Sequence, residues 1–316
     1  MNPTSNAVQN EEGAYIEALI NFRDVGISTK VDGQQYVKDG LIFRSGTLDQ
    51  LSNDQVEQFI KAHNIKTILD LRTSLEGKDN LPIDKNFPTT AIENIKAIDL
   101  ITADVTPERH ESNQPETDHG RKKYRVNFAG RSFERNVVWN MCTLWLKLRL
   151  IFWILVGNKV HATLLVGSEI LTPMGLPTMY KQFLKACKNE ILDALRIFTD
   201  PTNYPIHVHC TQGKDRTGMV CMLLQGIAGV PEDVIVADYA RTQEGLAPVL
   251  PQMIKEMAKS GLSEEFATAR PEYMREVLTY LKSEYGGILP YLNSIGFGPS
   301  WQDRIRKNIC PEAASN

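Results

Sequence analysis

The sequence predicts an α/β fold, with a central, mainly parallel sheet flanked by helices and a helical insertion between about residues 100 and 176. One observation behind this prediction is a compact apolar strand at Ile65–Leu71, which directly follows a helical pattern. Another is a buried-strand pattern at Tyr204–His209, followed at once by an apolar helical run. Strands that alternate with helices favour parallel pairing. The composition agrees, because 42% hydrophobic and 23% charged residues are typical of a globular protein.

The chain is expected to form a single domain after a short tail. Residues 1–14 are polar and acidic and predict a flexible tail, which leaves 15–312 for the domain. Ser52 and Gln55 have the spacing of a capping box, in which each side chain bonds the other residue's backbone amide. This pair predicts a helix that runs to about His63.

The other elements are predicted from apolar periodicity and from the prolines and glycines at element ends. A short strand is expected within Tyr36–Arg44, and helices are expected at Pro177–Phe198, Thr217–Ala228, Pro231–Thr242, Val249–Ser260 and Pro271–Tyr285. Val105–Lys123, by contrast, is charged and contains two prolines, so it predicts a disordered loop within the insertion.

The stretch Val137–Gly157 is the most apolar part of the chain and holds three of the four tryptophans. It predicts an apolar helical lid over residues 132–157. Its length alone permits a membrane span, but Lys147 and Arg149 lie at its centre, where each charge costs about 2.5–3.5 kcal/mol in a bilayer. A span would also separate two strands that the fold pairs in one sheet. The lid is therefore preferred, with an in-plane membrane contact and a span as alternatives.

The charge balance and the cysteines argue against several classes of protein. A net charge of −3 gives no general attraction to nucleic acid or anionic lipid. Five scattered cysteines without a Cys-x-x-Cys pair argue against a disulfide framework or a zinc site and favour a reducing compartment. The first fourteen residues lack the cationic start and apolar run of a secretory signal. We therefore expect a cytoplasmic protein, peripheral to membranes at most.

The segment 209–218, with the sequence HCTQGKDRTG, carries the strongest functional signal. It joins the strand that ends at His209 to the apolar helix. The amides of such a loop and of the first helical turn have no intrahelical partner, so they converge on one point and bind anions. The positive charge of Arg216 and of the helix end favours the thiolate form of a cysteine placed there, and a thiolate is a nucleophile. Cys210 is thus the expected nucleophile.

The pattern Cys-x5-Arg-Thr-Gly after a histidine resembles the signature of the cysteine-dependent protein tyrosine phosphatases. The form with Gly-Lys-Asp before the arginine is similar to a branch of bacterial and fungal tyrosine and phosphoinositide phosphatases. Segments 21–26 (NFRDVG) and 68–72 (ILDLR) are similar to the same branch, and the resemblance runs from about Ala18 to about Ile309. It implies a tyrosine phosphatase-like fold and hydrolysis of phosphotyrosine proteins, phosphoinositides or both, without metal, cofactor or nucleic acid.

Most residues of the signature are expected to surround a phosphate. Arg216 is expected to bind the phosphoryl group through two N–H donors, a fork that lysine lacks. Gly213 permits the turn that makes the amides converge, and Gly218 permits close packing of the helix. Thr211 and Gln212 are expected to line the phosphate site.

Three further side chains of the signature have alternative interpretations. The Thr217 hydroxyl is expected to donate to the departing thiolate, or else to be an ordinary first-turn hydroxyl. His209 is expected to orient the loop through hydrogen bonds rather than to transfer protons or bind a metal. Lys214 is expected at the rim, as a second cation for multiply phosphorylated substrates or as a solvated lysine.

A leaving alkoxide or phenoxide needs a proton, so a general acid is expected. No aspartate occurs between Asp118 and Asp193, and Asp193 falls in a predicted helix. Asp215 lies inside the loop, and we expect it to act as general acid and then as base for the attacking water. Similar roles are ascribed to this aspartate in the branch that the chain resembles. Asp200 is the reserve candidate, and a purely structural Asp215 is the alternative.

Two upstream pairs are expected to support the site. Asp70 and Arg72 end a strand at the edge where ligands bind in open α/β sheets. Arg72 is expected to contact phosphate, with structural pairing to Glu76 or Asp24 as the alternative. Arg23 and Asp24 have the same two interpretations.

Two functions of other classes compete with hydrolysis. A non-catalytic phosphate-binding module of the same fold would use the cradle without turnover. A sulfur-transfer enzyme would also present a loop cysteine, although the Arg-Thr-Gly ending of the loop favours phosphate.

Overall fold

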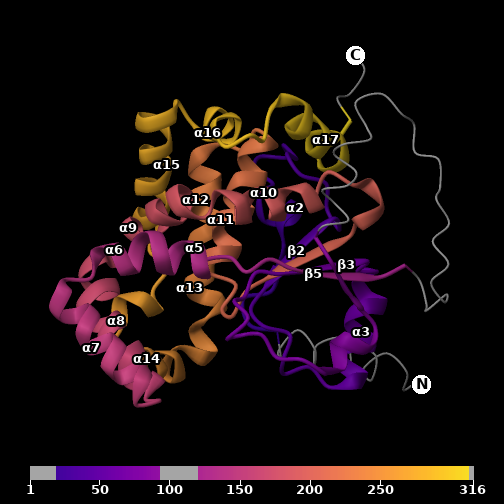
Figure 1. Cartoon of the computed structure of the whole chain (residues 1–316). Coiled ribbons are helices and arrows are strands. Elements are labelled where there is room, and N and C mark those ends of the chain that lie inside the picture. The colour runs from indigo at the N-terminus through magenta and orange to yellow at the C-terminus, as the bar shows by residue number, and fades with distance from the viewer. Residues whose placement is uncertain (1–18, 93–119, 313–316) are drawn as a thin grey trace.

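The computed structural model describes residues 19–92 and 120–312 (Figure 1). Its centre is a six-stranded sheet with the strand order β1-β2-β6-β3-β5-β4. The strands are β1 (Arg23–Asp24), β2 (Ile42–Ser45), β3 (Thr67–Asp70), β4 (Thr89–Thr90), β5 (Lys122–Arg125) and β6 (Ile206–His209). β1 is antiparallel to β2, and the other neighbours are parallel. The predicted mainly parallel sheet is therefore confirmed.

The register of the three central strands fixes where the signature segment begins. Ser45 at the end of β2 and Asp70 at the end of β3 both pair with His209 at the end of β6. The carboxyl ends of these strands therefore meet in one row, and Cys210 follows directly. This edge is the usual ligand site of an open α/β sheet.

Helices surround this sheet. They are α2 (Val25–Ser28), α3 (Asn53–His63), α5 (Arg131–Phe133), α6 (Trp139–Met141), α7 (Leu144–Leu155), α8 (Lys159–Val166), α9 (Thr172–Ala186), α10 (Lys188–Ile197), α11 (Asp215–Ile227), α12 (Glu232–Ala240), α13 (Thr242–Gly245), α14 (Leu250–Lys259), α15 (Pro271–Tyr285), α16 (Ile288–Ser294) and α17 (Pro299–Ile309). Short 3₁₀ turns are η1 (Pro82–Lys85), η4 (Pro201–Asn203), η5 (Ala247–Val249) and η6 (Glu264–Ala267), and π-helical turns are η2 (Glu134–Val138) and η3 (Gly167–Leu171).

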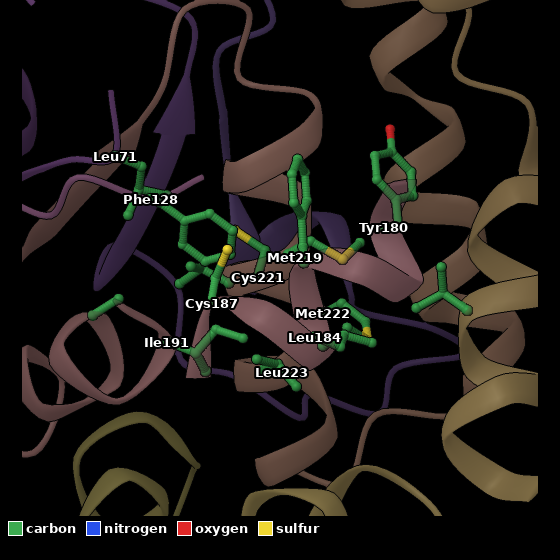
Figure 2. Close-up of a cluster of buried hydrophobic side chains, with 14 of the residues drawn as sticks. Leu71, Phe128, Tyr180, Leu184, Cys187, Ile191, Met219, Cys221, Met222 and Leu223 are labelled. Atoms are coloured by element: carbon green, nitrogen blue, oxygen red, sulfur yellow. The ribbon is translucent and has the colours of Figure 1, made fainter. Parts of the chain in front are cut away.

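Successive side chains of each strand point to opposite faces of the sheet, and each face packs against its own core cluster. Phe43 and Ile68 join the smaller core cluster, which includes the buried side chains of α3. Ile42 and Leu69 join the larger cluster, which contains the buried side chains of α9, α10 and α11. Helix α11 is buried along almost its whole length. Figure 2 shows Met219, Cys221, Met222 and Leu223 of this helix among side chains of α9 and α10.

The local sequence signals for helices were mostly accurate. The Ser52 hydroxyl accepts from the Gln55 amide at 3.2 Å, and the Gln55 side chain accepts from the Ser52 amide at 2.9 Å, which confirms the capping box of α3. The single helix predicted at Pro177–Phe198 is wrong, because the chain forms α9 and α10 with a non-helical break at Cys187 (φ −103°, ψ 35°). Helix α9 also begins earlier than predicted and bends at Gly175.

The predicted loop Val105–Lys123 needs a correction at its end. Residues 105–119 lie outside the described residues, but Lys122 and Lys123 belong to β5, which pairs with β3. Lys123 is buried, and its Nζ lies 2.7 Å from the Asp84 carboxylate. The run of charges predicted a solvated loop. The ion pair with Asp84, which is distant in the sequence, stabilises the charge of the buried lysine instead. The predicted tail 1–14 also lies outside the described residues.

The apolar stretch forms several short helices instead of one. Helix α6 ends at Met141, the chain is extended at Cys142, and Thr143 caps α7. With α8 these helices form the α6–α8 segment (residues 139–166), at the lower left of Figure 1. Only Leu146 and Leu150 of α7 are buried. The exposed large apolar side chains of this segment are Trp139, Met141, Leu144, Trp145, Leu148, Ile151, Phe152, Ile154, Leu155, Val156 and Val160. Among the described residues, no helix has the length and apolarity needed to cross a bilayer.

Candidate active site

Cys210 begins a tight loop between β6 and α11, as the sequence predicts. The cysteine is 1% exposed, and the helix starts five residues later at Asp215. Gly213 has φ +65°, in the left-handed region. A Cβ atom there would lie 2.2 Å from the carbonyl oxygen of Ser45, so the loop backbone passes too close to β2 for any other residue.

The carbonyl groups of the loop are held from outside. Asn21 Nδ2 donates to the carbonyls of Gln212 at 3.2 Å and Gly213 at 3.0 Å. Arg44 Nη2 donates to the same Gly213 carbonyl at 2.8 Å. In a trans peptide the N–H points opposite to the C=O. These contacts therefore orient the amides of Gly213 and Lys214 away from the bracing side chains of Asn21 and Arg44, which is the orientation that an anion cradle requires.

A buried carboxylate positions both braces. Asp238 accepts from Arg23 Nε at 2.8 Å, from Arg44 Nη1 at 2.9 Å and from Gln225 Nε2 at 3.0 Å. Burial alone would raise the pKa of Asp238, but the two guanidinium groups hold that pKa well below its usual range. Arg23 also donates to the Asn21 side chain at 2.5 Å. Arg23 thus supports the loop through Asn21 and Asp238, which fits the structural interpretation of this arginine.

The neighbouring Asp24 has a different place. Its carboxylate accepts from the amides of Gly26 at 2.7 Å and Gly40 at 2.6 Å, and it caps α2. Burial raises the pKa of Asp24. Its function is to join α2 to the turn before β2, and the structure does not bring it to the cradle.

Arg72 was predicted to contact phosphate, and the structure contradicts this. Its Nε and Nη2 donate to Asp70 at 2.9 Å, and its Nη1 donates to Asp49 at 2.9 Å and to Thr47. All three nitrogen atoms are occupied, and the side chain is buried. Pairing with Asp70 and Asp49, instead of the predicted Glu76 or Asp24, makes Arg72 a brace between β3 and the chain after β2. Burial would raise the pKa of Asp70, but His209 and Arg72 lower it well below its usual range.

His209 is buried beside this pair. Its Nδ1 lies 3.2 Å from the carbonyl oxygen of Cys210, and its Nε2 lies 3.9 Å from the Asp70 carboxylate. Burial lowers the pKa of His209. A neutral imidazole bonded to the first loop carbonyl fits the predicted orienting role.

Arg216 is paired with Glu76, which the sequence suggested as an alternative partner of Arg72. Its Nη1 and Nη2 each donate to one oxygen of Glu76 at 2.6 Å. Burial would raise the pKa of Glu76, but the hydrogen bonds and charge of Arg216 lower it to about 2. Thr211 donates to the same carboxylate at 2.8 Å, so its hydroxyl lies with Arg216 at the mouth of the loop. The Nε–Nη2 edge of the guanidinium adjoins this pair, and its Nη2 also lies 3.3 Å from the Thr211 hydroxyl.

The prediction that Lys214 lies at the rim is wrong. The side chain is fully buried, and its Nζ donates to the carbonyl oxygens of Phe266 and, at 3.1 Å, Thr268. Burial lowers the pKa of Lys214, although Asp215, 3.6 Å away, opposes this shift. The lysine therefore ties the loop to η6. The sequence could not indicate this, because the acceptors are backbone groups about fifty residues away.

Asp215 occupies the first turn of α11 at the edge of the cradle. Tyr180 of α9 donates to its Oδ1 at 2.5 Å, and the hydroxyl groups of Tyr180 and Tyr239 lie 2.9 Å apart. Burial, together with the negative charge of Asp215, raises the pKa of Tyr180 well above its usual value, so this phenol stays a donor. One carboxylate oxygen is thus held by Tyr180, and the side chain is about a quarter exposed.

The reserve candidate Asp200 lies at the other end of the strand. Its carboxylate accepts from the amide and hydroxyl of Thr202, and it caps η4, which precedes β6. Cys210 follows the opposite end of β6, about 13 Å away for a four-residue strand. This distance removes Asp200 as an acid for a group bound at Cys210.

Three signature side chains remain close to the cradle. Thr217 is fully buried, and within the described part of the chain its Oγ1 has no hydrogen-bond partner. The Gln212 Oε1 is also buried without a partner there. Buried polar atoms are rarely unsatisfied, so both atoms are suited to a group that enters the site. A Cβ on Gly218 would lie 3.4 Å from the Tyr239 ring, which agrees with the predicted close packing.

Comparison with known families adds an independent finding. The model of the tyrosine phosphatase family matches residues 14–143 and 168–311. The chain belongs to this family. Its match omits residues 144–167, which hold α7 and α8.

Curated relatives agree with this membership. The triple specificity protein phosphatase PtpB of Mycobacterium tuberculosis is 32% identical over 118 residues, which are 32% of this chain and 42% of that protein. A tyrosine-protein phosphatase of Nostoc commune is 32% identical over 134 residues, 39% of this chain and 45% of that protein. The inositol diphosphatase DSP3 of Arabidopsis thaliana is 33% identical over 54 residues, 17% of this chain and 27% of that protein. The chain thus spans less than half the length of each of these relatives.

Proposed function

We propose that the protein is a phosphomonoester hydrolase that acts through a phosphocysteine at Cys210. The observation that carries this proposal is the loop around Cys210, whose carbonyls are tied outwards by Asn21 and Arg44. A ring of inward amides together with Arg216 stabilises the negative charge of a phosphoryl group held above a buried sulfur atom.

The first step transfers the phosphoryl group to sulfur. The Cys210 thiolate attacks phosphorus while the ester P–O bond breaks. The Nε–Nη2 edge of Arg216 holds two equatorial oxygens, because Glu76 occupies the Nη1–Nη2 edge of the guanidinium. Asp215 gives its proton to the departing oxygen, and Tyr180 holds the other carboxylate oxygen.

The second step returns the enzyme to its starting state. Asp215 accepts a proton from water, the water oxygen attacks phosphorus, and the P–S bond breaks to release phosphate. The Thr217 hydroxyl, which is buried and has no partner among the described residues, donates to the departing sulfur anion.

The proposed substrates are phosphotyrosine proteins, phosphoinositides or both. Two relatives are named a triple specificity protein phosphatase and an inositol diphosphatase. The burial of Lys214 removes the rim cation that favoured multiply phosphorylated ligands, so this residue no longer tilts the choice towards lipid. A cytoplasmic location with peripheral membrane contact through residues 137–157 completes the proposal. Five cysteines without disulfides support a reducing compartment.

A non-catalytic phosphate-binding module is the second candidate, and turnover separates the two. Wild-type protein should hydrolyse para-nitrophenyl phosphate, and Cys210→Ser should abolish hydrolysis while retaining phosphate binding. Binding of phosphate without any turnover by the wild type would favour the module instead. A persulfide on Cys210, detected by its mass, would favour sulfur transfer.

A further inference from the structure

The α6–α8 segment exposes more large apolar side chains than the rest of the described chain together. Among the described residues, eleven of the fourteen exposed large apolar side chains lie within 139–160. Trp145 is 69% exposed and Leu155 is 81% exposed. Such a concentration of exposed apolar side chains in one segment is typical of an interaction surface. The family model also omits 144–167, so the catalytic fold does not account for these helices.

Cationic side chains border this surface. Residues 131–160 contain five arginine and lysine residues and one glutamate, a net charge of +4 in a chain of net charge −3. Arg149 is paired with Glu169. Across 19–92 and 120–312, no carboxylate lies within ion-pair distance of Arg131, Arg135 or Lys147. The local charge therefore complements an anionic partner.

A groove links the cations to the apolar surface. It has a volume of about 500 Å³ and is lined by Arg131, Ser132, Glu134, Arg135 and Trp139. Trp139 belongs to both features, because its ring lines the groove and lies 5.2 Å from Lys147 Nζ of α7. Tryptophan with neighbouring cations is the side-chain set found where a protein meets lipid headgroups.

We propose that the α6–α8 segment docks on an anionic membrane, with a lipid phosphate or carboxylate in the groove of Arg131, Arg135 and Trp139. The α7 side chains Trp145, Leu148 and Phe152 enter the interface between headgroups and acyl chains. A second copy of this chain is a poorer occupant, because its own +4 surface would face this one. Twelve residues of α7 reach about 18 Å, which suits a helix lying in the membrane plane.

Docking would place the loop of Cys210 near the membrane surface. Phe133 of α5 packs against Phe183 of α9 with ring centroids 5.0 Å apart, and α9 carries Tyr180 to Asp215. This consequence rests on the proposed function, since it favours phosphorylated groups at a membrane. The docking itself specifies the membrane contact proposed above and does not depend on hydrolysis, so it is measured in the absence of a phosphomonoester substrate.

Binding to vesicles tests the proposal. We expect the full chain to sediment with vesicles of phosphatidylcholine and phosphatidylserine but not with phosphatidylcholine alone. Tryptophan emission should shift to the blue on binding, and added salt should weaken binding. The double variant Arg131→Ala/Arg135→Ala should bind about 30-fold more weakly, since each cation near the surface contributes about fivefold. Trp145→Ser/Phe152→Ser should lose more than about a hundredfold.

Matched controls lie elsewhere on the surface. Ile27→Ser removes an exposed apolar side chain of α2, and Lys61→Ala removes an exposed cation of α3, so both should bind like the wild type. Equal binding to neutral and anionic vesicles, or no binding to either, would overturn the proposal. Self-association in solution that the Trp145→Ser/Phe152→Ser variant abolishes would assign the surface to a second copy and overturn it as well.

Discussion

The loop around Cys210 and the α6–α8 segment differ in how they treat charge and apolar surface. Around the loop, buried charges are paired: Asp238 binds two guanidinium groups, and Arg72 binds two carboxylates. In the α6–α8 segment, most of α7 faces solvent, and the pair Arg149–Glu169 is about one-third exposed. The first region is organised before any ligand arrives, whereas the second leaves apolar surface for a partner. Preorganised dipoles are what phosphoryl transfer requires of a protein.

Replacing Arg216 with lysine should have the largest effect and tests whether the loop needs a fork. Lysine keeps the charge but cannot hold two phosphoryl oxygens and the Glu76 carboxylate together. We expect kcat for para-nitrophenyl phosphate to fall about 10³-fold, the scale of a lost oxyanion donor. A fall of less than about tenfold would show that charge alone suffices. The variant Arg149→Lys, in the other region, should leave kcat unchanged.

The next effect compares one carboxylate from each region. Asp238→Asn leaves Arg23 and Arg44 without a full counter-charge in a buried site, so urea unfolding should show a loss of about 3 kcal/mol. Glu169→Gln breaks the pair with Arg149, which is about one-third exposed, and should cost less than about 1 kcal/mol. Equal losses in the two variants would contradict the contrast between the regions.

Asp215→Asn separates chemistry from architecture within the loop. Asparagine can still accept from Tyr180 but cannot give up a proton, so the fold should keep its stability. Turnover of a poor leaving group such as an alkyl phosphate should fall about a hundredfold, and turnover of para-nitrophenyl phosphate should fall much less. Equal slowing of both substrates would remove the acid role from Asp215.

Acid should lower the free energy of unfolding, because three carboxylates around the loop have lowered pKa values. The pKa values of Asp238, Asp70 and Glu76 are lower in the folded state than the usual value near 4, and that of Glu76 is about 2. These carboxylates take up protons on unfolding, so their stabilisation is complete above about pH 5 and is lost as pH falls towards 2. Unfolding free energies measured across this range should decline, and Glu76→Gln should reduce the slope. A stability that rises on acidification would contradict these pairings.

The sequence predicted what is local and missed what is distant. The Cys210 loop, its strand and its helix lie within 206–227, so spacing and periodicity were enough to predict them. The braces Asn21 and Arg44 lie more than 160 residues from the carbonyls that they hold. Their signals were an asparagine in a recognisable motif and an arginine at a strand end, neither of which identifies a partner.

Two misplaced side chains have the same cause. Lys214 is buried because η6 supplies carbonyl acceptors, and Arg72 is occupied because Asp49 and Asp70 reach all of its nitrogen atoms. A cation near a phosphate loop is expected to be solvated or ligand-bound when its neighbours are unknown. The apolar stretch was predicted to be helical, but its exposure was not predictable, because apolar helices are normally buried.

Covalent trapping during turnover tests the central claim most directly. The protein is mixed with para-nitrophenyl phosphate, quenched within one turnover and analysed by mass spectrometry of the peptide that contains Cys210. The proposed mechanism predicts a single added phosphoryl group on Cys210, which accumulates further in Asp215→Asn and is absent in Cys210→Ser. Turnover with no phosphoryl group on that cysteine, or undiminished turnover in Cys210→Ser, would contradict it.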